Sequence, residues 1–139
     1  MIEGKTVVVT GGGKGIGRHA ALTFAKAKAK VAIVDVNEES LNKTTEELNM
    51  FSEVTSVNAD IRDEKAVHKM FSKVYQRFGQ IDVLVNNAAI VPHFAWGIPR
   101  WPLIRDMNKD FWDRVINTNL GGTFLCTKSV LPYMEKQNS

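Results

Sequence analysis

A cluster of glycines lies between an apolar run and a helical pattern, and it is the stretch of this chain best suited to bind a charged group. Gly11, Gly13, Gly15 and Gly17 follow the β-branched residues 6–9, and a helical pattern begins directly after them. Gly11 suits a tight turn, Gly15 lets a phosphate approach the backbone, and Gly17 permits close packing of helix on strand. The first helical turn then offers N–H groups and a partial positive charge. The pattern predicts a dinucleotide phosphate site, with an ordinary strand-to-helix loop as the alternative.

A carboxylate at the end of the second predicted strand bears on which dinucleotide binds. Asp35 lies 18 residues after Gly17, where an acid can accept both hydroxyls of an adenosine ribose. Its charge would repel a 2′-phosphate, so Asp35 favours NAD over NADP. Lys14 is the opposing signal, because a cation in the glycine loop would attract a 2′-phosphate. Capping of the next helix is the alternative role for Asp35, although Asn37 can also provide that cap.

Polar residues follow the third and fourth predicted strands as well. Asp60 can meet the amino group of an adenine, with Ile61 packing nearby, and a plain turn is the alternative. The run Asn86-Asn87-Ala88-Ala89 combines amides that can tie strand ends together with small side chains that leave room for a flat cofactor.

Asn119 stands in the middle of the last predicted helix, where asparagine has low helical propensity. Gly121 and Gly122 follow it and weaken the helix further. The pattern predicts a kink at which the amide has a polar role. An exposed asparagine on a bent helix is the alternative.

Four short apolar segments alternate with helical patterns over the first 85 residues. We expect strands at residues 6–9, 31–34, 54–57 and 81–85, and helices at residues 18–29, after the cap Asn37, and between the cap Asp63 and Gly79. Short connections in this order predict a doubly wound α/β fold with a parallel sheet of strand order 3-2-1-4. A ligand should lie over the carboxyl ends of strands one and four.

The remaining third of the chain begins with a loop and ends with a helix. Residues 90–107 carry three prolines and the tryptophans Trp96 and Trp101, which form either a packed lid or a partner surface. A long helix is expected over residues 109–135.

Composition places the chain among ordinary soluble globular proteins. Of its 139 residues, 44% are hydrophobic and 24% charged, which fits one domain over residues 1–139. The net charge of +3 is scattered over helix faces, so no nucleic-acid partner is expected. Without a targeting signal or a membrane-spanning run, we expect a cytoplasmic protein with no membrane partner. The single cysteine, Cys126, excludes an internal disulfide, and no metal site is expected.

Together, these motifs resemble the classical short-chain dehydrogenase/reductase family in order and spacing along the whole chain. The matching positions are Thr10-Gly-x-x-x-Gly15-Ile-Gly17, Asp35, Asp60, Asn86-Asn-Ala-Ala89 and Asn119. The resemblance implies a Rossmann fold that binds NAD(P) and moves hydride to or from a small-molecule alcohol or ketone.

The resemblance also implies roles for single residues. The glycine loop would hold the pyrophosphate, Asp35 the ribose, and Asp60 and Ile61 would flank the adenine. Asn119 would be the active-site asparagine, which holds a proton-relay water at the helix kink. The cofactor-binding positions implied in this way are Gly11, Gly13, Lys14, Gly15, Ile16, Gly17, Asp35, Asp60, Ile61, Asn87, Ala88 and Ala89.

The chain departs from the family in its catalytic core. Family enzymes use a serine and a Tyr-x-x-x-Lys motif, in which the lysine lowers the pKa of the tyrosine for acid–base work. The two tyrosines here, Tyr75 and Tyr133, are followed four residues later by Gly79 and Gln137. The chain thus resembles the N-terminal half of such an enzyme, ending before a fifth strand, and we expect it to be inactive alone. A non-catalytic NAD-binding or assembly module is the alternative function.

Two apolar surfaces are expected to stay uncovered, namely the outer edge of strand four and one face of the last helix. In the family this helix packs against its copy in a neighbouring subunit, so the resemblance implies a homo-oligomer.

Overall fold

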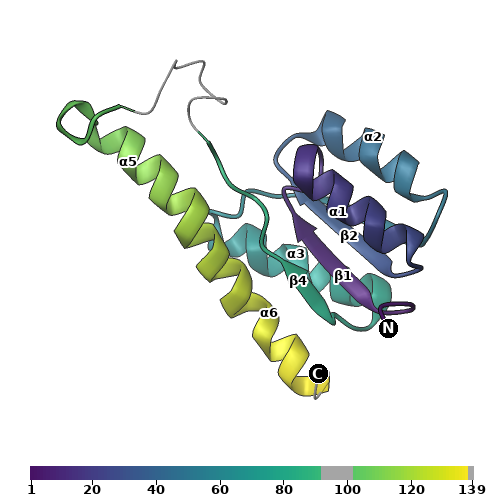
Figure 1. The fold of residues 1–139 in the computed structure, drawn as a ribbon. Coiled ribbons are helices and arrows are strands. Elements are labelled where there is room, and N and C mark those ends of the chain that lie inside the picture. Colours follow the sequence, from purple (N-terminus) through teal and green to yellow (C-terminus); the bar gives the residue numbers. More distant parts are fainter. Residues whose placement is uncertain (92–101, 138–139) are drawn as a thin grey trace.

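A parallel sheet lies between two layers of helices in the computed structural model, which describes residues 1–91 and 102–137 (Figure 1). The strands are β1 (Thr6–Thr10), β2 (Lys30–Asp35), β3 (Val54–Asn58) and β4 (Val83–Val85). Their order is β3-β2-β1-β4, and each neighbouring pair is parallel. The predicted α/β fold and its strand order 3-2-1-4 are confirmed.

Helices cover both faces of this sheet. α1 (Gly15–Lys26) and α2 (Glu38–Leu48) pack on one face, and α3 (Glu64–Phe78) and α6 (Thr123–Gln137) pack on the other. A short 3-10 turn, η1 (Ile104–Asp106), precedes α5 (Lys109–Ile116), which continues through a π-helical turn, η2 (Asn117–Gly122), into α6. We call α5, η2 and α6 together the long helix; Figure 1 shows it running from green to yellow, with its α5 end extending beyond the sheet.

Alternation of side chains along β1 explains the two layers. Val7 and Val9 pack with Leu41 of α2 in one buried cluster, whereas Val8 packs with Phe71 of α3 in the other. Successive side chains of a strand point to opposite faces, so an unbroken apolar run requires cover on both. Each fully buried valine stabilises the fold by about 1.5–3 kcal/mol.

Side chains cap the N-termini of α2, α3 and α5, but not that of α1. Asn37, Asp63 and Asn108 each accept hydrogen bonds from first-turn N–H groups of α2, α3 and α5. Lys14 precedes α1, and its side chain makes no such bond within the described part of the chain. The first-turn N–H groups of α1 are therefore not capped by the residue that begins it.

Both ends of α1 and the start of β4 differ from the predictions. α1 begins at Gly15 rather than residue 18, because the last glycines form its first turn, and it ends at Lys26, just before Lys28 takes a left-handed φ of 64°. β4 begins at Val83 rather than residue 81, because the N–H and C=O of Ile81 bond to a side chain of α6.

The predicted break in the last helix is confirmed. Asn119, Gly121 and Gly122 lie in the π-helical turn, which separates two regular helical segments. Glycines and asparagine tolerate the wider turn because their helical propensity is low. Most of the predicted loop at residues 90–107, including Trp96 and Trp101, falls outside the described residues.

Two further observations concern the chemistry expected from composition. Within residues 1–91 and 102–137, no helix is both long enough and apolar enough to cross a bilayer. Cys126 is a buried free thiol on α6, and its burial raises the pKa of the thiol to about 11.

Candidate functional site

The carboxyl ends of β1 and β4 are joined by a buried hydroxyl. Thr10 Oγ1 donates to the carbonyl of Val85 at 3.3 Å and accepts from the N–H groups of Asn87 and Ala88, each at 3.1 Å. Because β1 and β4 are neighbours in the sheet, this hydroxyl places the segment after β4 directly beside the glycine loop.

The side chain of Asn87 strengthens the same junction. Its Nδ2 donates to the carbonyls of Thr10 at 3.0 Å and Gly11 at 3.2 Å. Asn86 instead donates to Thr127 Oγ1 of α6 at 3.1 Å. Asn87 therefore ties the ends of β4 and β1 together, as predicted for the paired amides, whereas Asn86 bonds to α6 instead.

The glycine loop is folded so tightly that most added side chains would clash. A Cβ on Gly17 would lie 2.1 Å from the Gly11 carbonyl oxygen and 2.5 Å from Asn87 Nδ2, and one on Gly11 would lie 2.9 Å from the Cα of Ala88. Gly11 also has a φ of +65°, as a tight turn requires. The predicted roles of Gly11 in a turn and of Gly17 in close helix packing are therefore confirmed.

Gly15 is the position at which this loop opens outward. An added Cβ there would meet no described atom within 4 Å, although the φ of +56° still favours glycine. Ile16, the next residue, is 82% exposed. The start of α1 thus combines an open approach to the backbone with first-turn N–H groups, which is the arrangement that binds a phosphate.

Asp35 borders the loop from the end of β2. Its Oδ2 accepts from the N–H of Gly13 at 3.1 Å, and its Oδ1 accepts from the N–H of Asn37 at 3.1 Å. Thr44 of α2 holds the loop from the other side, since its Oγ1 donates to the Gly13 carbonyl at 2.9 Å. The carboxylate is therefore fixed beside the glycine loop, and the cap of α2 comes from Asn37, whose Oδ1 accepts from Ser40 N at 2.8 Å.

Asp60 and Ile61 follow β3, and each already has a partner in the protein. Arg62 binds the Asp60 carboxylate through two guanidinium nitrogens, and this hydrogen bonding holds the pKa of Asp60 below its ordinary value despite partial burial. The side chain of Ile61 is only 7% exposed and packs where a Cβ on Gly122 would fall. Little of the Ile61 side chain is therefore accessible to a ligand at this edge.

Asn119 reaches back to the segment after β4. Its Oδ1 accepts from the N–H of Ile90 at 2.8 Å, and its Nδ2 donates to the carbonyl of Ile90 at 3.1 Å. One amide thus satisfies both backbone groups of a single residue, two positions beyond Ala88. The π-helical turn gives Asn119 a structural partner, in contrast to the alternative of an exposed asparagine.

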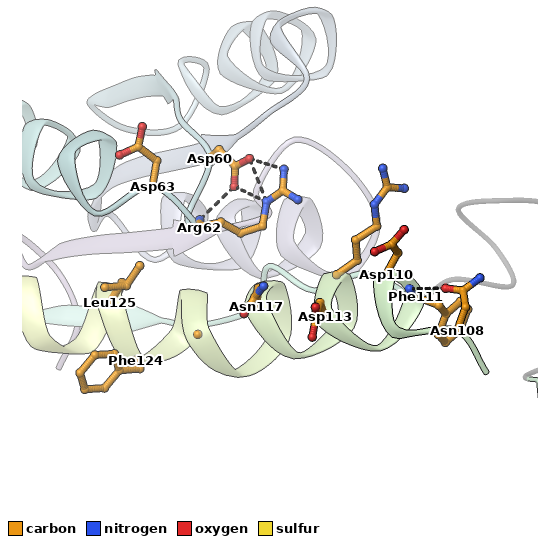
Figure 2. A pocket seen from close by; sticks show the side chains of 12 residues that line it. Asp60, Arg62, Asp63, Asn108, Asp110, Phe111, Asp113, Asn117, Phe124 and Leu125 are labelled. Carbon is orange, nitrogen blue, oxygen red and sulfur yellow. Dashed lines mark hydrogen bonds and ion pairs between the residues drawn. The ribbon is translucent and has the colours of Figure 1, made fainter. Parts of the chain in front are cut away.

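A groove of about 1060 Å³ lies beside this edge, between the loop after β3 and the long helix (Figure 2). Asp60, Arg62 and Asp63 form one wall, and helix residues from Asn108 to Leu125 form the other. Asp60 belongs to both this groove and the predicted site, whereas no residue of the glycine loop lines the groove. The part of the chain that the structure describes holds no group of three His, Cys, Asp or Glu side chains arranged for a metal ion.

The structure thus gathers most of the predicted site residues at one edge of the sheet. The glycine loop, Asp35 and the segment 86–89 are linked by direct hydrogen bonds, and Asn119 joins them through Ile90. Sequence reasoning did not assign Thr10, Thr44 or Ile90 to the site. A threonine that ends an apolar strand directly before a glycine was the signal for Thr10, whereas the backbone role of Ile90 left no signal in the residue type.

Comparison with known proteins agrees with this fold and site. Residues 5–139 match the sequence pattern of the short chain dehydrogenase family, and the chain belongs to this family.

Three similar proteins illustrate the relationship. The chain is 39% identical over 138 residues to the short chain dehydrogenase/reductase dpmpG of Macrophomina phaseolina, covering 98% of this chain and 75% of that protein. It is 37% identical over 139 residues to the 3-oxoacyl-(acyl-carrier-protein) reductase FabG of Thermotoga maritima, covering 99% and 53%. The structure of an NAD⁺-bound xylitol dehydrogenase superposes with a TM-score of 0.90 at 32% identity, covering 99% of this chain and 50% of that one. The chain therefore spans about half the length of the Thermotoga and xylitol dehydrogenase chains.

Proposed function

We propose that this chain is the dinucleotide-binding half of an NAD-dependent short-chain dehydrogenase that interconverts an alcohol and a ketone. The observation that carries the proposal is the loop between β1 and α1. Its glycines are closely packed except at Gly15, where the backbone is open beside the uncapped start of α1. A pyrophosphate fits such a place, because it needs close backbone approach and N–H donors.

Each part of the dinucleotide has a matching element along this edge. The pyrophosphate would lie on Gly15, Ile16 and Gly17, with the other loop glycines shaping the turn. The ribose of the adenosine would bind Asp35, and the adenine would lie near Asp60 and the main chain of Ile61. The nicotinamide half would run along Asn87, Ala88 and Ala89 toward Asn119. When bound, the nicotinamide supplies the hydride, while these residues only bind and orient it.

The choice of NAD over NADP rests on charge at the ribose. The carboxylate of Asp35 is held beside the loop by Gly13 N, so a 2′-phosphate placed there would face a fixed negative charge. Lys14 directly follows Gly13, but its side chain is exposed and makes no capping contact among the described residues. We expect the carboxylate to have the larger effect on cofactor choice, because it is already held in place, whereas the exposed lysine must lose side-chain entropy to bind a 2′-phosphate.

Titration with NADH and NADPH should therefore separate the two cofactors. We expect NADH to bind at least about tenfold more tightly, a difference of about 1.4 kcal/mol. Asp35→Ala and Asp35→Asn should narrow or reverse this preference, whereas Glu46→Ala, which removes an exposed charge from the far side of α2, should leave it unchanged. Tighter binding of NADPH by the unmodified chain would overturn the preference for NAD.

The 139-residue chain by itself should not turn over substrates. Neither of its tyrosines has a lysine four positions later, and the rings of Tyr75 and Tyr133 pack against each other with centroids 5.0 Å apart. An acid–base tyrosine needs a neighbouring cation to lower its pKa. Oxidation of NADH with a panel of ketones would be measured, and turnover at an ordinary enzyme's rate would contradict this expectation. Dinucleotide binding without turnover is also what the alternative, a non-catalytic binding module, would show.

Association through the long helix completes the proposal. Leu120 and Phe124 are 64% and 60% exposed, and Trp112 and Leu131 of the same long helix are 48% and 45% exposed. Apolar side chains at this spacing on one helix favour packing against another helix. We expect a dimer or larger species in sedimentation at micromolar concentrations, which Phe124→Glu should shift toward monomer. A monomer for the unmodified chain would argue against this interface.

A further inference from the structure

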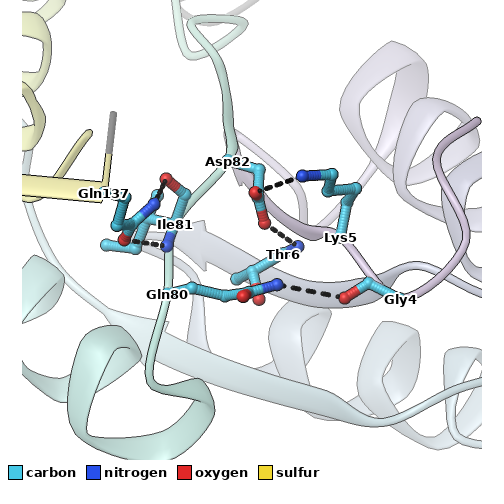
Figure 3. A network of polar contacts seen from close by, with 7 residues as sticks. All are labelled: Gly4, Lys5, Thr6, Gln80, Ile81, Asp82 and Gln137. Atoms are coloured by element: carbon cyan, nitrogen blue, oxygen red, sulfur yellow. Dashed lines mark hydrogen bonds and ion pairs between the residues drawn. The ribbon is translucent and has the colours of Figure 1, made fainter. Parts of the chain in front are cut away.

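Two side-chain amides of the long helix each bind both backbone groups of one residue, at opposite ends of β4. Asn119 does so at Ile90, as described above. Gln137, near the other end of the helix, does so at Ile81, since its Oε1 accepts from the N–H at 2.9 Å and its Nε2 donates to the carbonyl at 3.0 Å (Figure 3). We call these the Asn119 clamp and the Gln137 clamp.

The Gln137 clamp attaches the helix to a fixed point. Figure 3 shows that the segment before β4 is bonded to the start of β1 from its other side. Asp82 accepts from Thr6 N at 2.8 Å and pairs with Lys5 Nζ at 3.0 Å, and Gln80 donates to the Gly4 carbonyl at 3.2 Å. Ile81 itself is fully buried, and its two bonds to Gln137 are part-buried.

The two clamps are spaced to act together. The 18 residues from Asn119 to Gln137 span about 27 Å of helix, and the nine residues from Ile81 to Ile90 could span at most about 30 Å if the chain were fully extended. A helix that shifted or rotated by one residue would break both pairs, because each amide must face one backbone N–H and one C=O at once.

The apolar contacts of α6 do not set this register by themselves. Its buried residues are the small side chains Cys126, Ser129 and Val130, whereas Leu125, Tyr133 and Met134 are partly buried and pack against the same core. Apolar burial is not directional, so it defines the register of a helix less sharply than hydrogen bonds do. The directional contacts of the long helix with the rest of the domain include those of the two amides, and also the exposed Asn86–Thr127 hydrogen bond and the exposed ion pair of Lys128 with Glu64.

We propose that Gln137 is a positioning residue, which holds the long helix in register along β4 and thereby places Asn119 against the segment that lines the cofactor site. Only its consequence for cofactor affinity rests on the proposed function; the coupling between the two clamps does not. Since coupling between two sites is reciprocal, a change at either clamp should be felt at the other.

Hydrogen exchange of the Ile81 and Ile90 amides tests the coupling. In Gln137→Ala, we expect exchange at Ile81 to rise by roughly tenfold or more and exchange at Ile90 by at least about threefold. Asn119→Ala should in turn raise exchange at Ile81. Lys136→Ala, an exposed neighbour on the same helical turn, should change neither. Faster exchange at Ile81 with unchanged exchange at Ile90 would overturn the proposal.

A second variant and a measurement of NADH affinity complete the test. If Gln137→Ala does not fold, Gln137→Glu retains an acceptor for Ile81 N–H while losing the donor, and the same pair of amides is then compared. NADH affinity is measured in parallel, with a loss of about threefold expected in Gln137→Ala, matching the effect at Ile90. A chain that binds no NADH would contradict the proposed function, yet the exchange at Ile90 would still decide the role of Gln137.

Discussion

Gly17→Ala should abolish dinucleotide binding and destabilise the whole domain. The added methyl would lie 2.1 Å from the Gly11 carbonyl oxygen and 2.5 Å from Asn87 Nδ2, so α1 must move away from the ends of β1 and β4. Overpacking typically costs about 1–3 kcal/mol, and we expect the upper end of this range here because the methyl would meet backbone atoms and change the shape of the loop. Urea unfolding measures the stability, and titration with NADH measures binding.

Two other glycine variants separate the fold from the site. Gly15→Ala meets no described atom within 4 Å, so it should cost only the about 1–2 kcal/mol of its left-handed backbone while weakening NADH binding strongly. Gly121→Ala, whose Cβ would make an ordinary contact of 3.7 Å with the Ile116 carbonyl oxygen, should change neither property. An unchanged unfolding midpoint for Gly17→Ala would contradict the close approach of α1 to the loop.

Asn87→Ala should also be strongly damaging, with a loss of roughly 2–4 kcal/mol. It removes the donor shared by the Thr10 and Gly11 carbonyls and leaves both part-buried acceptors without that partner. The junction between β1 and β4 should loosen, and NADH affinity should fall with it. Thermal unfolding and NADH titration of the same preparation would show both effects.

Asn86→Ala is the matched control, because it removes an identical side chain one position earlier. Asn86 donates to Thr127 Oγ1 in an exposed bond, so its loss should cost less than about 1 kcal/mol. Equal effects of the two variants would argue that the amides serve only general packing, and not the specific tie to the glycine loop.

Local patterns accounted for most of the architecture. The β-branched run of β1 required burial on both faces, and Asn37 and Asp63 marked the starts of α2 and α3, since a cap acts within three residues. Strand order followed from short connections and right-handed crossovers. Asn119 with the two glycines after it predicted the interruption of the long helix for the same local reason, low helical propensity.

Contacts between distant residues accounted for the rest. β4 is shorter than its apolar pattern because Gln137, 56 positions away, takes the backbone groups of Ile81. The Thr10 hydroxyl binds main-chain atoms 77 and 78 positions later. No periodicity or propensity carries such pairings, because the partners are backbone groups that every residue possesses.

The sequence by itself thus determined the class of fold, the glycine loop and the polar residues that end each strand, because these depend on local conformation and on the hydrophobic pattern. Only the tertiary structure decided how the site is held together. It showed that Asp35, Thr44 and Asn87 hold the glycine loop by hydrogen bonds. It also showed that Gly15 is the one glycine of this described loop with open space around it, and that Asn119 bonds to the backbone of Ile90. These outcomes depend on which chain segments meet at one sheet edge, and that meeting is set by packing of the whole domain.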